Sequence, residues 1–433
     1  MRRRRLNHAP SGRVQQPLSR LLYAAAVWVC PTSTMRVSEQ ELFQRFFGQL
    51  LAGGTLSASQ AHAARCIAGC GTLALGAHVL GCPSGACEQL QFHACRHRLC
   101  PRCAESSRNR WVEQELQRLL PCPHFHVVFT LPHELLPLWA CNRARCVALL
   151  FRAVRESLLQ LLANPRVLGA TPGLLLSLHT WGRNLSAHPH IHALVSAGGI
   201  DPAGLWRSCR PNWLLPLPAL QQLFSRKLLA GLKALLGSMR LPSGSTAEHW
   251  LAVLRSLYRQ HWNIEIRPAY PHGRGVLLYL ARYAKGGPVP RSRCFELLHD
   301  RVDFDYLDHR SGCTRTLHTT ALALLRRLLW HTPPRGVHTT RHAGLYACAL
   351  TLQHQQALAQ LPGIEPRPWP RPAPSPPPPS TLCAHCGLPM LRLRRLAPVP
   401  QAAPSLHRFG EFAPSPLQHH SPSARSPPRR GPT

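Results

Sequence analysis

Two spacings of apolar residues alternate along the middle of the chain, and they predict alternating helices and strands. Apolar residues three and four apart indicate helices over 37–53, 105–120, 137–163, 220–237, 247–262 and 275–285. The first helix has a capping signal, because Ser38 is the expected N-cap and Glu41 follows three residues later. β-branched or alternating segments indicate strands over 125–131, 173–181, 190–199 and 263–270. The short link between the second and third strands predicts an antiparallel pair. We therefore expect an α+β domain with a mainly antiparallel central sheet flanked by helices.

Changes of composition divide the chain into five predicted segments. Residues 1–57 are expected to form a basic leader and a helix, and 58–107 a separate cysteine-rich module. The main α+β domain is expected over 108–290, with its C-terminal part over 291–361. Proline, arginine and serine dominate residues 362–433, which predicts a disordered tail with local polyproline II.

The charge of the chain points to a polyanionic partner. The 433 residues carry a formal net charge of +33, and only Lys227, Lys233 and Lys285 of the 51 basic residues are lysine. Such an excess favours nucleic acid as the partner, although a strong arginine bias can also come from nucleotide composition. The apolar run at 21–30 is short and lies well inside the chain, so it is interpreted as a helix or strand and not as a signal peptide. No apolar run approaches the ~18 residues that a membrane helix needs, so no membrane partner is expected.

Clustered cysteines predict a zinc site. Seven of the 17 cysteines lie between residues 66 and 103, which is unlike the even spread of a secreted disulfide scaffold. The pairs Cys82-x4-Cys87 and Cys100-x2-Cys103 could supply four thiolates to a tetrahedral Zn²⁺, the alternative being buried free cysteines. Further candidates are Cys95, and in reserve Cys66, Cys70 and His93. Cys383-x2-Cys386 stands alone after the proline-rich stretch, either as half a site or as a relic. Arg96, Arg98 and Arg102 lie between the ligands and are expected to touch phosphate.

The segment HPHIHALVSAGG, residues 188–199, predicts a second metal site. Residues two apart on a strand point the same way, so His188, His190 and His192 share one side of it. Imidazoles in register can converge on one ion, whereas a lone histidine would more often be structural. The chemistry leaves the ion open, because imidazole suits zinc, tolerates manganese and is less suited to magnesium, which prefers oxygen.

Two tyrosines four residues apart supply candidate nucleophiles. Tyr279 and Tyr283 lie on one face of the predicted helix 275–285, with Cβ atoms ~6 Å apart. The simpler alternative is a pair of amphipathic core residues. A phenol with a pKa near 10 is about one part in a thousand ionised at neutral pH. Attack on a phosphodiester would therefore need a metal ion at the phosphate, with Arg282 and Lys285 adding positive charge.

Together, these features resemble the HUH endonucleases, and more narrowly the rolling-circle transposases of the insertion-sequence family IS ninety-one. The resemblance covers roughly residues 60–350 and includes CRHRLCPRC, FHVVFTLPHEL, LHTWGRNLSAHPHIHALV, YLARYAKGGPV, DHRSGCTRTL and HTPPRGVHTTRHAGL, in one order. It implies that residues 108–290 form an HUH nuclease domain, preceded by a zinc ribbon and followed by the tail. It also implies an enzyme that works in the bacterial cytoplasm, at the nucleoid.

The resemblance assigns roles to the candidate residues. His190 and His192, with His188 as a possible third, resemble the HUH ligands for Mg or Mn, and Tyr279 and Tyr283 resemble the two nucleophiles. The zinc-ribbon ligands would be Cys82, Cys87, Cys100 and Cys103, although the four residues between the first pair and Leu99 in place of a histidine depart from the family pattern. The implied reaction nicks single-stranded DNA, with hairpin-bearing element ends as the expected substrate. It leaves a 5′-phosphotyrosine and a free 3′-OH, and needs no ATP.

Three other functions fit parts of the pattern. A plasmid replication initiator or relaxase would use the same chemistry, but the N-terminal ribbon and the segment HTPPRG…RHAGL argue against it. A zinc-ribbon DNA-binding relic without catalysis would not need the retained histidines and tyrosines. A zinc hydrolase using HPHIH would need a nearby carboxylate base, and none precedes Asp201 in the flanking sequence.

Overall fold

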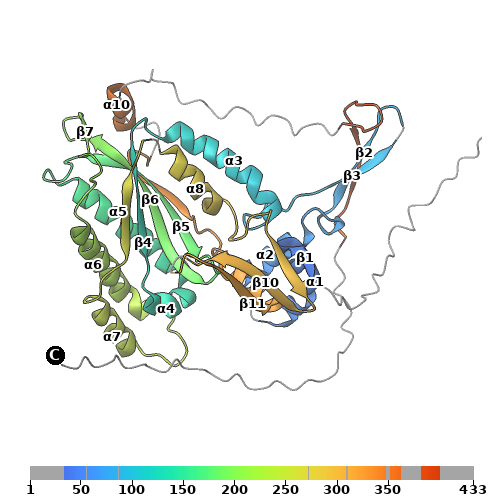
Figure 1. Ribbon diagram of the computed structural model, residues 1–433, viewed down its shortest axis with the longest axis horizontal. Coiled ribbons are helices and arrows are strands. Elements are labelled where there is room, and N and C mark those ends of the chain that lie inside the picture. Colours follow the sequence, from blue (N-terminus) through green and yellow to red (C-terminus); the bar gives the residue numbers. More distant parts are fainter. Residues whose placement is uncertain are drawn as a thin grey trace, which may run out of the picture.

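The computed structural model describes residues 34–54, 56–85, 87–271, 273–308, 311–347, 352–361 and 382–399, except the side chains of Arg282 and Tyr283. The predicted element at 21–30 lies outside these residues. Within them, three antiparallel sheets and their helices form the body shown in Figure 1. The α+β class with a mainly antiparallel central sheet is thereby confirmed.

The central sheet has six strands, and helices cover both of its faces. Its order is β12 (Thr340–Gly344), β5 (Thr171–Trp181), β6 (Ala187–Ile200), β4 (His124–Thr130) and β8 (Ile264–Tyr270), with β7 (Trp206–Ser208) paired to β6. The predicted antiparallel pairing of 173–181 with 190–199 is confirmed, since β5 and β6 pair from Thr171↔Ile200 to Trp181↔Ala187.

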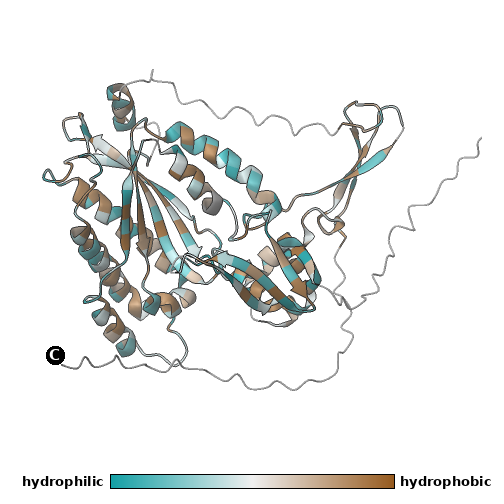
Figure 2. Ribbon diagram, viewed as in Figure 1, coloured by the Kyte–Doolittle hydropathy of each residue, from teal (hydrophilic) through white to brown (hydrophobic). Residues whose placement is uncertain are grey.

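One face of the central sheet packs on a large helical layer. This layer contains α4 (Leu136–Cys141), α5 (Arg143–Leu162), α6 (Leu217–Leu235) and α7 (Ala247–Leu257), with short 3-10 turns at His133–Leu135 and Leu236–Ser238. The inward residues of β4 and β6, such as Phe129 and Ile191, join the apolar faces of α5 and α6 in the largest core. Figure 2 shows the matching brown stripes on these elements.

The opposite face of the central sheet is covered by α3 (Pro101–Arg118), α8 (Arg274–Ala284) and α10 (Leu352–Gln360). Leu194 of β6 and Leu277 and Leu280 of α8 belong to the second core on this side. Because alternate residues of a strand face opposite sides, the histidines that flank Ile191 point to the face that α8 covers.

A second layer brings together two segments that are far apart in the sequence. Its sheet has the order β1 (Met35–Ser38), β9 (Cys294–Leu298), β10 (Arg301–Leu307) and β11 (Thr314–Thr320), and it packs on α1 (Glu39–Ala52), α2 (Ala58–Gly69) and α9 (Ala321–Trp330). The capping box predicted at Ser38 and Glu41 is present at the start of α1. The sequence did not predict that residues 35–69 and 294–330 share a core.

A small third sheet projects from the body (Figure 1). It has the order β13 (Leu391–Leu396), β2 (Ala77–Gly81) and β3 (Glu88–Phe92), and a 3-10 turn at Leu73–Leu75 precedes β2. The structure differs here from the expected disordered tail over 362–433. Residues 391–396 alternate leucine and arginine and pair with β2, and the rest of 382–399 is also described. The remainder of the predicted tail lies outside the described residues.

Candidate active site and metal centres

Three histidines from two neighbouring strands converge beneath α8. His179 of β5 pairs directly with His190 of β6, and His192 follows two residues later on the same face. One ring nitrogen from each of the three lies within 4.8 Å of the other two. Three nitrogens that approach so closely can bind a single divalent ion.

The protonation of these rings suits metal binding. The Nδ1 atom of His190 donates a hydrogen bond of 2.6 Å to the carbonyl oxygen of His188, so the lone pair is left on Nε2. Burial lowers the pKa of His190 to about 4 and the pKa values of His179 and His192 well below the usual range. All three rings are therefore neutral at physiological pH, the form in which imidazole binds a metal ion.

A fourth histidine, His126 of β4, supports the cluster from behind. Its Nε2 atom lies 2.7 Å from Nδ1 of His192, and the two rings stack with centroids 4.9 Å apart. The Nε2 atom of His192 is buried and makes no hydrogen bond among the described residues. The bond to His126 thus fixes the His192 ring and leaves Nε2 as its ligand atom.

His188, the third ligand suggested by the sequence, occupies a different place from the cluster. Its ring lies 5.0 Å from the His190 ring and 5.8 Å from the His133 ring, measured between centroids. It does not belong to the group of nitrogens within 4.8 Å, where His179 takes the third position. The geometry therefore favours His179, which comes from the neighbouring strand, as the third ligand.

Tyr279 lies against the histidine cluster. Its ring centroid is 5.8 Å from that of His192 and 6.0 Å from that of His126, and 39% of the residue is exposed. Tyr283 follows one turn later on α8, but its side chain lies outside the described residues. Lys285 caps the C-terminal end of this helix and is partly buried, and this burial, with a smaller contribution from Arg98, lowers the pKa of its ammonium group.

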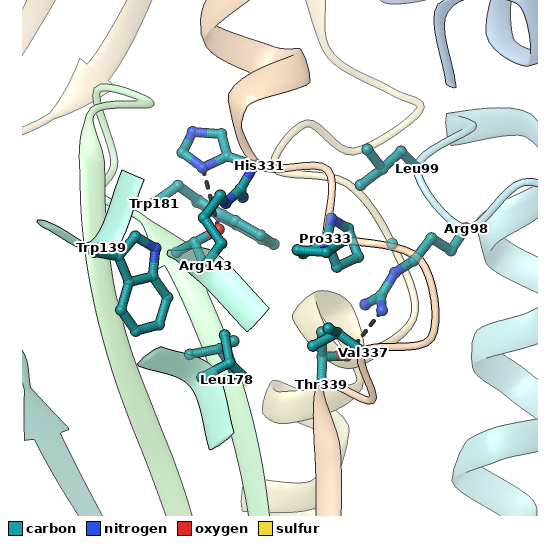
Figure 3. Close-up of a pocket in the computed structure, with 14 residues that line it drawn as sticks. Arg98, Leu99, Trp139, Arg143, Leu178, Trp181, His331, Pro333, Val337 and Thr339 are labelled. Atoms are coloured by element: carbon teal, nitrogen blue, oxygen red, sulfur yellow. Dashed lines mark hydrogen bonds between the residues drawn. The ribbon is translucent and has the colours of Figure 1, made fainter. Parts of the chain in front are cut away.

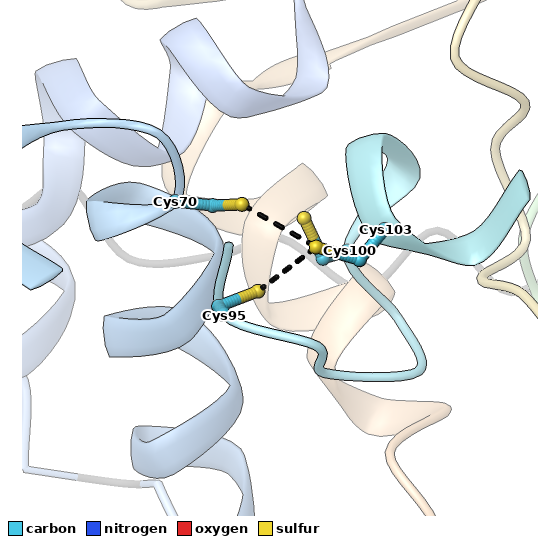
Figure 4. Close-up of side chains that lie close together, drawn as sticks. All are labelled: Cys70, Cys95, Cys100 and Cys103. Carbon is cyan, nitrogen blue, oxygen red and sulfur yellow. Dashed lines mark hydrogen bonds between the residues drawn. The ribbon is translucent and has the colours of Figure 1, made fainter. Parts of the chain in front are cut away.

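Four cysteines meet where α2 ends and α3 begins (Figure 4). The cluster consists of Cys70, Cys95, Cys100 and Cys103, and the Sγ atom of Cys103 lies 3.5 Å from that of Cys70 and 3.7 Å from that of Cys95. These separations approach the ~3.8 Å edge of a tetrahedron with ~2.3 Å Zn–S bonds, and they are far longer than the ~2.05 Å of a disulfide. A hydrogen bond with Cys95 and the backbone N–H groups that begin α3 lower the pKa of Cys100 to about 5. The residues therefore fit a structural Zn²⁺.

The four cysteines predicted to share one zinc ion are separated into two clusters. Cys100 and Cys103 belong to the group at α3, whereas the Sγ atoms of Cys82 and Cys87 lie 3.3 and 3.5 Å from those of Cys386 and Cys383. The pairing differs because β2 and β3 carry Cys82 and Cys87 into the projecting sheet. Of the three reserve residues, Cys70 joins the cluster at α3, whereas Cys66 lies against His62 and Nδ1 of His93 bonds the Leu75 carbonyl oxygen.

Arg98, which was expected to touch phosphate, joins the loop of the cysteine cluster to the end of α8. Its guanidinium group donates hydrogen bonds of 2.9 Å to Oγ1 of Thr339 and to the carbonyl oxygen of Ala284, the last residue of α8. Figure 3 shows Arg98 reaching into a small pocket that Trp139, Trp181 and other residues line. The expectation that Arg98 touches phosphate is therefore wrong, since two of its guanidinium nitrogens bond inside the protein and the third, Nε, is buried.

A groove runs between α3 and α8 and continues along the loop that follows α8. Its lining includes Arg108 from α3, Arg274 from α8 and Arg291 from the loop that follows α8, with Glu113 as an acidic member. The positive charge of this groove suits a phosphate backbone.

Several of these residues were absent from the sequence-based site. His126 lies in a segment, 125–131, that was predicted as a strand, and His124 and His126 repeat the two-residue spacing of the HPHIH segment. That spacing was the available signal. No signal pointed to His179, because strand pairing alone brings it opposite His190.

Two regions of the chain match known protein families. Residues 42–131 match the family described as "Transposase zinc-binding domain", and residues 173–353 match the family described as "Putative transposase". The fold and site therefore define a transposase with an N-terminal zinc-binding domain.

Two relatives place the chain more narrowly. It is 34% identical over 332 residues to "Putative transposase y4qJ" of Sinorhizobium fredii, covering 74% of this chain and 82% of the relative. It is 31% identical over 290 residues to "Transposase for insertion sequence element IS801" of Pseudomonas savastanoi pv. phaseolicola, covering 64% of this chain and 68% of the relative. The chain belongs to this family of IS91-type insertion-sequence transposases, which carry out rolling-circle transposition. No solved structure matches it significantly.

As a transposase the chain is a DNA-binding, DNA-cleaving protein. None of its described helices is both long and apolar enough to cross a membrane.

Proposed function

We propose that this transposase nicks and rejoins single-stranded DNA through 5′-phosphotyrosine intermediates, with Tyr279 as the first nucleophile. The observation that carries the proposal is the placement of Tyr279 beside the cluster of His179, His190 and His192. Metal-assisted attack on a phosphodiester requires a nucleophile beside the residues that bind the metal ion. Tyr279 has this position relative to the three neutral histidines.

The step forms one bond and breaks one bond. The Tyr279 oxygen attacks phosphorus, the bond to the 3′ oxygen breaks, and the proton lost by the phenol is balanced by the proton gained by the leaving 3′-OH. A divalent ion held by the three histidines would polarise the phosphate and stabilise the charge that develops on it. Imidazole ligands favour Mn²⁺ over Mg²⁺ in such a site.

The protein's own residues would position the DNA around this centre. The groove lined by Arg108, Arg274 and Arg291 supplies positive charge along the catalytic helix. A single strand, or the base of a hairpin at an element end, would follow this groove and bring one phosphate beneath α8. Lys285 at the end of the helix is proposed to stabilise the same phosphate, and Tyr283 to act as the nucleophile of the second cut. The reaction would take place in the bacterial cytoplasm, on DNA of the nucleoid.

Incubation with labelled DNA from the element end tests the proposal. Zinc-loaded protein should give a covalent protein–DNA band on a denaturing gel with single-stranded DNA and Mn²⁺. The band should be absent with a chelator or with the blunt duplex. His192→Ala should lose the band, whereas His133→Ala, which alters a histidine outside the cluster, should retain it. DNA binding without any covalent band in the wild-type protein would support the binding-only alternative.

A further inference from the structure

We propose that the chain holds a second structural zinc ion, bound by Cys82 and Cys87 from its N-terminal part and by Cys383 and Cys386 from its C-terminal part. This inference goes beyond the proposed nuclease activity. The matched zinc-binding domain contributes six cysteines to the two cysteine clusters of the described chain. Four of them, Cys70, Cys95, Cys100 and Cys103, form the cluster at α3 by themselves. The remaining two meet partners that lie 296 and 304 residues away in sequence and outside both matched regions.

Three of the four sulfurs form a compact group, and the fourth, that of Cys87, joins it through Cys383, an arrangement close to that of one tetrahedral ion. The Sγ atoms of Cys82 and Cys386 are 3.3 Å apart, those of Cys87 and Cys383 are 3.5 Å apart, and those of Cys82, Cys383 and Cys386 all lie within 4.8 Å of one another. These values are near the ~3.8 Å expected between thiolates on one Zn²⁺. A disulfide would need ~2.05 Å and would pair the sulfurs two by two.

Two tight turns present the sulfurs as zinc knuckles do. In the first, the Cys82 N–H donates to the Cys87 carbonyl oxygen, and Gly85 has a φ of +73°. In the second, the N–H of Gly387, whose φ is +70°, donates to the Cys383 carbonyl oxygen. Glycine adopts these left-handed conformations without strain, so each turn can fold its two sulfurs toward one ion. The His385 N–H also donates to the Cys383 sulfur at 3.4 Å, within the same turn.

The sheet that carries these turns has only a small apolar core of its own, made by the buried residues Ala77, Val79 and Leu80 of β2. None of the described residues of β2, β3 or β13 belongs to the three main hydrophobic clusters. Leu391 and Leu393 of β13 remain 57% and 55% exposed. A three-stranded sheet of this size buries too little apolar surface for independent stability, and small domains of this kind use a metal ion in place of a core. The ion would close the ribbon and tie residues 382–396 to the N-terminal zinc-binding domain.

Zinc content of the full chain carrying His192→Ala, purified under reducing conditions, tests the proposal, because this change disables the histidine cluster as a further zinc site. The His192→Ala protein should contain two zinc ions per chain, and adding Cys383→Ser/Cys386→Ser should leave one. The matched control adds Cys294→Ser/Cys313→Ser, which removes two exposed cysteines outside both clusters, and should retain two. One ion in the His192→Ala protein, or two after the Cys383/Cys386 change, would overturn the proposal.

A second measurement does not depend on the folding of that variant. A protease site is inserted between residues 362 and 381 of the otherwise wild-type chain, which is then cleaved under reducing conditions. The C-terminal fragment should co-elute with the rest of the protein and separate when a zinc chelator is added. Separation before the chelator, or co-elution that survives complete zinc removal, would contradict a shared ion.

Discussion

The bond between His126 and His192 leads to a quantitative prediction for the proposed catalytic metal site. Both residues are buried, at 2% and 4% exposure, and the bond between Nε2 of His126 and Nδ1 of His192 measures 2.7 Å. The variant His126→Phe keeps an aromatic ring but leaves the His192 N–H without its partner. An unsatisfied buried donor costs about 1–3 kcal/mol, and loss of such a support typically weakens metal binding about 10–100-fold, equivalent to ~1.4–2.7 kcal/mol.

The assay is calorimetric titration of Mn²⁺ into protein already loaded with zinc, so that the thiolate sites are filled. His124→Phe is the matched control, because His124 is equally buried on the same face of β4 but bonds to Tyr346 and the Cys122 carbonyl oxygen. Thermal melting checks that both variants are folded. A His126→Phe protein that binds Mn²⁺ within twofold of the control would refute the assigned role of His126.

Three further predictions concern stability. Burial lowers the pKa of His331 to about 4, so the unfolded chain takes up the proton first and stability falls as pH drops below about 6.5. Between pH 7 and pH 5 this residue should cost about 2 kcal/mol, and urea unfolding should show that loss in the wild type but not in His331→Gln; equal losses would contradict it. Arg98→Met should lower the free energy of unfolding by about 2 kcal/mol through the lost bonds to Thr339 and Ala284, and an unchanged urea midpoint would count against it. Chelation of zinc should expose the start of α3 to limited proteolysis, because Cys100 begins that helix, and unchanged protection would argue against zinc there.

Local features of the fold could be predicted because each depends on neighbouring residues. The capping box at Ser38 fixes the start of α1, and the apolar spacing of 275–285 predicts α8 with both tyrosines on it. The alternation of HPHIH places His190 and His192 on one face of β6. These patterns determine a conformation before any distant contact is made.

Features that depend on contacts between distant segments could not be predicted from spacing. His179 joins the cluster only because β5 pairs with β6 in the register that sets it opposite His190. The cysteine pairs were assigned to one ion because they are close in sequence, yet β2 carries Cys82 away toward β13. Arg98 was expected to touch phosphate because it is basic and lies between the proposed zinc ligands. Its hydrogen bonds to Thr339 and Ala284 connect segments that are distant in the sequence, so no spacing could predict them.

The most direct test of the central claim is to identify the residue that becomes linked to DNA. The covalent complex formed with single-stranded element-end DNA and Mn²⁺ would be digested, and the nucleotide-modified peptide sequenced by mass spectrometry, alongside Tyr279→Phe and Tyr283→Phe proteins. The account predicts a phosphonucleotide on Tyr279 in the first cut and no first cut in Tyr279→Phe, with Tyr283→Phe still forming the adduct. An adduct on any residue other than Tyr279, or undiminished first cutting by Tyr279→Phe, would contradict it.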